Sequence, residues 1–234
     1  VNNEPTQREK PYQAATTGAN PHAEISKAKN ALLKKAEELV GSNAHSTPMS
    51  EKPSCTPIPG TTSGASEGGE TEGAAATETS ICYVDGDLTI SNPTTWSIDA
   101  DENLIIVAKG DIVFSGTAPL NTITPGGFLG FIAGGTITFE EDMGNTTSQQ
   151  PNTLTPTPTV HAVFLADSIT IDGEPTGNGQ FVGKGVFAAV NDIMLQRKLS
   201  AGGDEYPASY FIHDSLLVQN APDFFKSTRL EWGK

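Results

Sequence analysis

The sequence predicts an all-β protein: a parallel β-solenoid, or β-helix, of about five coils, with an N-terminal α-helix and an extended arm before it. Three observations lead to this prediction. A seven-residue pattern recurs at near-constant spacing, the short β-rich segments end in Gly, Asn or Asp, and one stretch near the N-terminus has helical periodicity. Sequence repeats of about 20 to 50 residues are typical of solenoids and related repeat folds.

The N-terminal region predicts an arm followed by one helix. Residues 1–21 are polar, contain three prolines and show no periodicity, which is typical of an extended arm. A helix is predicted over 22–41, because Asn20 suits the N-cap, Pro21 the first turn and Gly41 the stop. Its apolar stripe packs either on its own domain or on another subunit. As an assembly helix, it would present to a neighbouring subunit Ile25, Ala28, Leu32 and Leu39.

Residues 42–80 are predicted to be a low-complexity linker. Pro, Gly, Ser and Thr occupy 18 of the 28 positions from 53 to 80. Such a composition cannot bury a core of its own. Ordering it costs conformational entropy, so its own domain or neighbouring copies would have to supply the compensating contacts.

The solenoid itself is predicted over residues 81–201. Its repeating unit has seven positions. A small residue, any residue, a turn residue and a polar residue come first, and an apolar residue, any residue and a second apolar residue follow. The units begin at residues 84, 108, 133, 166 and 189, with spacings of 24, 25, 33 and 23. The long spacing holds an inserted loop at 144–159, where Gly, Ser, Thr and Pro fill 11 of 16 positions.

Stacking of these units predicts a ladder of inward-pointing side chains. Ile112, Ile137 and Ile193 share one position of the repeat, with Leu88 beside them. A β-sandwich of short strands is the alternative, but antiparallel strands do not require the same pattern at constant spacing.

Residues 202–234 leave the repeat and are predicted to form an aromatic C-terminal cap. Solenoid ends expose unpaired backbone that must be covered. Aromatic side chains in such a place are also typical of a platform for glycans or a partner. The aromatic residues of this stretch are Tyr206, Tyr210, Phe211, Phe224, Phe225 and Trp232.

The C-terminal region also carries a family resemblance. The segments 207–214 (PASYFIHD), 220–222 (NAP) and 230–232 (LEW) resemble the C-terminal, β-helix-like region of large repeat-containing surface proteins of small-genome candidate-phylum bacteria. The likeness covers about residues 160–234 and departs from the family pattern at Ser209 and after Trp232. It implies a secreted or wall-attached β-helical protein without a known catalytic activity, and no site residues follow from it.

Charge and hydropathy exclude some functions. The chain has 14 Lys and Arg against 28 Asp and Glu, so its formal net charge is −14. Nucleic acid as a partner is therefore not expected, because phosphate binding requires clustered cations. No apolar run approaches the roughly 20 residues of a membrane span. With no secretion signal and no initiating Met, we expect Val1 to be either a processed end or an artificial one.

The chain has two cysteines, Cys55 and Cys82, and no CxxC motif. A disulfide between them would pin the linker to the first coil, and two free thiols are the alternative. The acidic, Thr-rich composition is typical of extracellular proteins and favours the disulfide.

Clustered carboxylates are the one group that suggests a metal site. Asp85, Asp87 and Asp111 lie at solenoid corners, where oxygens from adjacent coils could bind Ca²⁺. The alternatives are Asp side chains that bond the local backbone in turns, and catalytic acids of the kind that pectin-cleaving β-helix enzymes use. No other cofactor is expected. A phosphate-loop motif is absent from the sequence, and its four histidines are scattered.

Asn145 begins an N-glycosylation sequon, Asn-Thr-Thr, on the inserted loop. The repeat, the lack of a catalytic constellation and an N-terminal region that cannot fold alone favour an extracellular or cell-surface structural protein. It would self-assemble into a filament or surface layer, its arm mediating subunit contacts and its partner being itself. One alternative is an adhesin-like module that binds surface glycans. The other is a polysaccharide-degrading β-helix enzyme.

Overall fold

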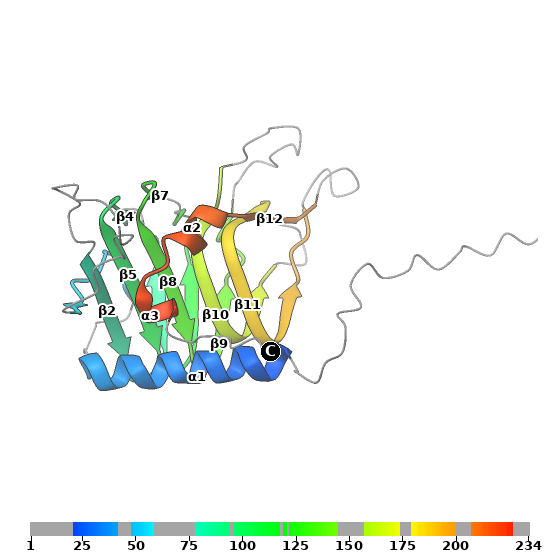
Figure 1. Cartoon of the computed structure of the whole chain (residues 1–234). Coiled ribbons are helices and arrows are strands. Elements are labelled where there is room, and N and C mark those ends of the chain that lie inside the picture. Colours follow the sequence, from blue (N-terminus) through cyan, green and yellow to red (C-terminus); the bar gives the residue numbers. More distant parts are fainter. Residues whose placement is uncertain are drawn as a thin grey trace, which may run out of the picture.

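The computed structural model describes residues 21–41, 48–58, 78–93, 96–117, 119–120, 122–144, 157–173, 179–199 and 207–226. It confirms the predicted fold class, a parallel β-solenoid with an N-terminal helix, and the solenoid has about 4 turns (Figure 1). The predicted arm before Pro21, most of the low-complexity stretch and the sequon at Asn145 lie outside the described residues.

The solenoid has two main sides and a short third one. The long strands of the first side stack in the order β2 (Glu78–Val84), β5 (Glu102–Ala108), β8 (Phe128–Ala133), β10 (Val160–Ile171), β11 (Phe181–Leu195) and β12 (Ser209–His213). The second side contains β3 (Leu88–Ser91), β6 (Ile112–Ser115), β9 (Thr136–Phe139) and the C-terminal halves of β10 and β11. The third side contains β4 (Ser97–Ile98) and β7 (Thr122–Ile123).

Neighbouring coils pair in parallel on all three sides, which excludes the β-sandwich. The predicted units fall at the corners between the first and second sides. At one corner the coils approach too closely for a side chain: a Cβ on Gly134, the second residue of its unit, would collide with the carbonyl of Lys109 in the coil before it. Glycine is therefore required at this corner, although other units carry a side chain at the same position.

The inward ladder forms as predicted in all coils except the last. Leu88, Ile112, Ile137 and Ile169 occupy one register position in successive coils, and each is 0% exposed. Ile193 continues the register, but its side chain is 42% exposed. Ile193 therefore belongs to the predicted ladder but is left uncovered, because no described strand stacks on that half of β11.

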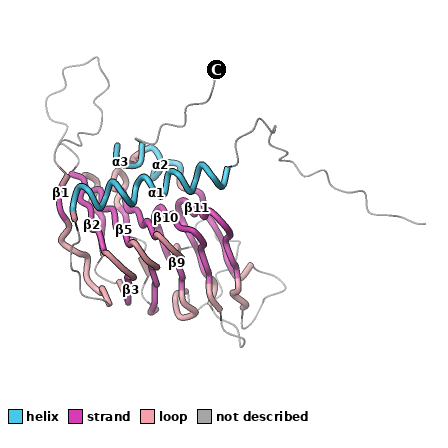
Figure 2. Tube along the Cα trace, turned by 90° about the horizontal axis from the view of Figure 1, so that it is seen from below, coloured by secondary structure: helices cyan, strands magenta, loops and turns pink. Residues whose placement is uncertain are grey.

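Helix α1 (Pro21–Val40) lies across the outer face of the first side (Figure 2). Leu32 and Ala36 are buried against a sheet surface that includes Ile81 and Ile105, and Ile25 packs at its border. The hypothesis that this stripe contacts another subunit is wrong for Leu32, since the chain's own sheet covers it. Ala28 is half-buried and Leu39 is 47% exposed.

A buried lysine fixes α1 in this position. Lys29 is 2% exposed, and its Nζ lies 2.7 Å from Asp167 Oδ1 and donates a hydrogen bond of 2.6 Å to the carbonyl of Gly134. Both partners belong to corners of the solenoid. A long amphipathic side chain thus crosses the helix–sheet interface and ends on polar groups at its edge.

Two short helices, α2 (Ser215–Gln219) and α3 (Asp223–Lys226), cover another part of the same side. Phe224 is buried there, and Phe225 packs with its ring centroid 5.1 Å from that of Phe128. A Cβ on Gly130 would lie 3.0 Å from the Phe225 ring, so the absence of a side chain in β8 makes room for α3. The predicted aromatic cap therefore covers the flank, while β12 adds a further strand to the stack.

Candidate functional site

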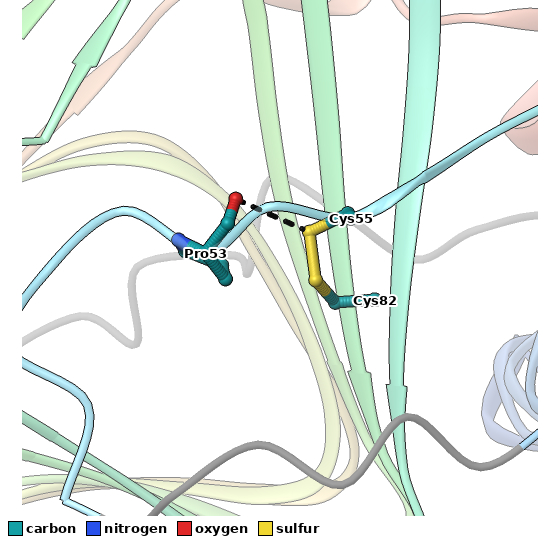
Figure 3. Close-up of a disulfide and its surroundings, with 3 residues drawn as sticks. All are labelled: Pro53, Cys55 and Cys82. Carbon is teal, nitrogen blue, oxygen red and sulfur yellow. Dashed lines mark hydrogen bonds between the residues drawn. A yellow bond between two sulfur atoms is a disulfide. The ribbon is translucent and has the colours of Figure 1, made fainter.

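The two ends of the solenoid are the candidate functional site, because they differ in how they are closed. At the N-terminal end, Cys55 and Cys82 form a disulfide with a Cα–Cα distance of 4.9 Å, the pairing expected from the sequence (Figure 3). Cys82 is fully buried in β2 and Cys55 is half-buried. The disulfide holds residues 48–58 across the first coil, where β1 (Thr56–Pro57) pairs antiparallel with β2.

Hydrogen bonds complete this closure. The Met49 amide donates to the Thr89 carbonyl at 2.8 Å, and the Ser91 amide donates to the Met49 carbonyl at 3.0 Å. Lys52 Nζ reaches Glu102 Oε2 at 2.9 Å. Part of the predicted linker therefore serves as a seal, and the side chains of Met49 and Trp96 are buried beneath it.

The C-terminal end is only half closed. β12 pairs with Phe181–Gly185 of β11, and in the described part of the chain no strand pairs with the outer edge of β11 from Val186 to Leu195. Ile193 and Leu195 are 42% and 55% exposed, although their partners Ile169 and Ile171 in the preceding coil are fully buried. Phe211 in β12 is 38% exposed and packs against Phe187 at 5.0 Å.

The carboxylates considered for Ca²⁺ bond to the protein itself. Asp87 Oδ1 accepts from the Asp111 amide at 2.9 Å, and Asp111 Oδ1 accepts from the Thr136 amide at 2.6 Å. Asp85 pairs with Lys109 at 2.8 Å, and that hydrogen bond raises the pKa of Lys109. Each carboxylate thus links one coil to the next as a turn residue. Among the described residues, no group of three or more His, Cys, Asp or Glu side chains could hold a metal ion.

A buried polar cluster joins the last coils to α2. His161 Nε2 lies 2.9 Å from Asp214 Oδ2, and Lys184 Nζ lies 3.2 Å from the same oxygen. Burial and the charge of Lys184 lower the pKa of His161, so its ring is neutral at pH 7 and donates to Asp214. Burial raises the pKa of Asp214, but the hydrogen bonds from Lys184 and His161 outweigh it and keep that pKa below its ordinary value. The other oxygen, Oδ1, caps α2 by accepting from the Leu216 amide at 3.0 Å.

A buried arginine joins the loops at the third side. Arg197 is 6% exposed, and its guanidinium donates to the carbonyls of Glu140, Asp172 and Gly179 at 2.9, 3.2 and 3.3 Å. The same group lies 5.7 Å from the centre of the Phe181 ring. Burial lowers the pKa of Arg197, and the charges of Asp172, Asp142 and Glu141 oppose this effect. The guanidinium therefore links consecutive coils by hydrogen bonds, next to the start of the inserted loop.

The sequence reasoning missed these internal tethers. The partners of Lys29, His161 and Arg197 are carbonyls or carboxylates 18 to 138 residues away. In the sequence Lys29 follows Lys27 closely and Arg197 precedes Lys198, so no local signal marks either cation as buried.

Comparison of the chain with protein-family models, curated proteins and solved structures finds no match. The resemblance to bacterial surface proteins therefore stays an expectation. No helix in the described ranges is long and apolar enough to cross a membrane.

Proposed function

We propose that this chain is an extracellular structural protein that associates with copies of itself at the cell surface. The observation that carries the proposal is the difference between the ends: a disulfide seals one end of the solenoid, while apolar side chains and an unpaired strand edge remain at the other. Exposed strand edges readily pair with another chain. A structural disulfide favours an oxidising, extracellular compartment.

The position of α1 changes which part of the chain can mediate these contacts. Because α1 packs on its own sheet, removing residues 1–42 would uncover Ile81, Tyr83 and Ile105. The informative truncation ends before the helix and removes residues 1–20 only. We propose that this polar arm contributes a second contact, which growth beyond a dimer requires.

Sedimentation velocity and electron microscopy of the purified, oxidised full chain test the proposal. We expect a mass that rises with protein concentration, and ordered assemblies for the full chain that become smaller without residues 1–20. A chain that remains monomeric at the highest attainable concentration would contradict the proposed function.

An adhesin-like glycan-binding module is the second candidate. It is supported by the exposure of Tyr210 and Phe211, which are 39% and 38% exposed and point to opposite faces of β12. An aromatic ring offers an apolar face for a sugar, and the Tyr210 hydroxyl adds a hydrogen-bonding group. Calorimetric titration with cell-wall polysaccharides, comparing the wild type with Tyr210→Ala, tests this candidate.

A further inference from the structure

Three apolar side chains of β11, the half-buried Phe187 and the exposed Ile193 and Leu195, occupy register positions that are buried in every earlier coil. We define the terminal apolar surface as Phe187, Ile193, Leu195 and Phe211. In the preceding coil the corresponding residues Phe164, Ile169 and Ile171 are fully buried. Among the described residues, no further core layer covers Ile193 and Leu195, while Phe211 of β12 packs against Phe187.

The edge beside this surface lacks the Lys and Pro residues that often protect edge strands, although a register shift bends it at the corner. Residues 186–195 (VFAAVNDIML) contain no Pro, Gly or Lys and one charged side chain, Asp192. Proteins usually blunt free edges with Lys, Pro, bulges or very short strands. The register shift opposite Ala166 and Ser168 bends β11 at the corner, where His22 Nδ1 contacts the Val190 carbonyl at 2.5 Å. The free edge is thus divided into a segment before the corner and one after it.

We propose that the terminal apolar surface and the adjoining edge of β11 form a tail-to-tail interface with the same end of a second copy of this chain. The inference rests on the proposed function and names its first contact. The partner surface is the C-terminal end of the second copy. The N-terminal end of that copy is not available, because Met49, the disulfide and β1 already cover it. Such an interface is isologous and closed, so it produces a dimer.

The size of the end face predicts a weak dimer. Strands of five to seven residues and sheets about 10 Å apart give an end face of roughly 25 by 20 Å. Two such faces in contact bury about 1,000 Å² in total, at the lower limit for a specific interface. Each copy carries a net charge of −14, which opposes association. Since salt screens charges beyond about 8 Å at 0.15 M, raising the salt concentration strengthens this dimer.

Spin labels on the second side of the solenoid test the geometry. Thr89 and Met194 occupy the same register position in the first and last coils. Both native cysteines are in the disulfide, so Met194→Cys or Thr89→Cys introduces the one free thiol of the chain. In a tail-to-tail dimer two Met194→Cys labels lie close together. Two Thr89→Cys labels lie about nine strand spacings apart, or roughly 43 Å. A short distance between Thr89→Cys labels would overturn the inference.

Charge variants of the edge give the second test. The double variant Ile193→Lys with Leu195→Lys should sediment at the 24.5 kDa of one chain at concentrations where the wild type sediments at twice that mass. The matched control is Leu216→Lys on α2, which is 59% exposed and outside the terminal apolar surface, and which should still dimerise. Wild-type assemblies that persist in the double variant would overturn this interface and leave the proposed function standing. A monomeric wild type would overturn both.

Discussion

Single buried cations hold together parts of the solenoid that the backbone ladder does not join. The strand ladders connect each coil to its neighbours, but the loops of the third side have only β4 and β7 as regular structure. Arg197 supplies hydrogen bonds between these loops, because its planar guanidinium can donate to several carbonyls at once. Lys29 plays the corresponding part between α1 and the corners.

Replacing Arg197 should therefore destabilise the protein strongly. Arg197→Ala leaves the carbonyls of Glu140, Asp172 and Gly179 without this donor, and we expect a loss on the order of 3 kcal/mol in the free energy of unfolding. Urea denaturation measures the difference. The control is Lys198→Ala, since Lys198 is the exposed cation next in the chain and its loss should cost less than about 0.5 kcal/mol. Equal losses for the two variants would refute the assignment.

The neutral state of His161 makes stability depend on pH. Burial and Lys184 lower the pKa of His161 in the folded state, whereas the unfolded chain titrates near 6.5. The unfolded state therefore binds a proton first, and stability falls as the pH drops from about 6.5 toward the folded pKa. Asp214, whose pKa is lowered in the folded state, adds a separate loss of stability when the pH falls below about 3.8, the ordinary pKa of this carboxyl.

The variant His161→Gln, which keeps a donor toward Asp214 but cannot titrate, isolates the first of these two losses. Urea denaturation between pH 8 and pH 5 should show a smaller loss of stability for this variant than for the wild type. Below pH 4 both proteins should lose stability alike, because Lys184 and Asp214 remain. The same slope in both proteins between pH 8 and pH 5 would show that His161 is not responsible.

At the level of elements, α1 acts as a cover for the first side of the solenoid. Its buried stripe meets a sheet surface of Ile81, Tyr83, Ile105 and Val107, which would otherwise be exposed. Burying apolar area of this kind contributes roughly 25 cal/mol per Å². The helix is thus part of the folding unit.

Two substitutions within α1 separate its two faces. Ala36 is 0% exposed against the sheet, so Ala36→Glu buries a charge and overpacks the interface, and we expect a loss of roughly 3 kcal/mol in the free energy of unfolding. Leu39, 47% exposed on the same helix, is the matched control, and Leu39→Glu should change the free energy by less than about 0.5 kcal/mol. Urea denaturation gives both values. A harmless Ala36→Glu would mean that α1 is not packed on this sheet.

The repeat predicted the coils and their corners because both depend on local rules. Small and turn residues such as Gly134 and Asp111 are required wherever the chain bends, and apolar residues such as Ile137 wherever it faces inward. Which coil is the last is not a local property, so the exposure of Ile193 could not be predicted. Nor can an apolar stripe such as that of Leu32 indicate whether the surface that covers it belongs to the same chain.

At the level of the whole molecule, the ends decide how the solenoid behaves. Stacked coils depend on their nearest neighbours, so an uncapped coil is the least stable part of such a fold. Here the first coil is sealed by residues 48–58, which precede the predicted solenoid, and β12 pairs with Phe181–Gly185 of the 15-residue strand β11. The proposed pairing of like ends rests on this difference between the two ends.

Reducing the disulfide should loosen the seal without unfolding the middle of the stack. Cys55 and Cys82 are 27 residues apart, and closing a loop of that size stabilises a fold by about 3–4 kcal/mol in the loop-entropy model. In reduced protein we expect faster hydrogen exchange at the Met49 and Ile58 amides, which bond to the Thr89 and Thr79 carbonyls. The amide of Phe131, in the middle of the stack, should keep its protection, because its neighbouring coils are unchanged.

With the edges of β2 and β3 freed, reduced protein should also form assemblies larger than a dimer in sedimentation velocity. Unchanged exchange at Met49 after complete reduction would show that hydrogen bonding alone, without the disulfide, closes this end.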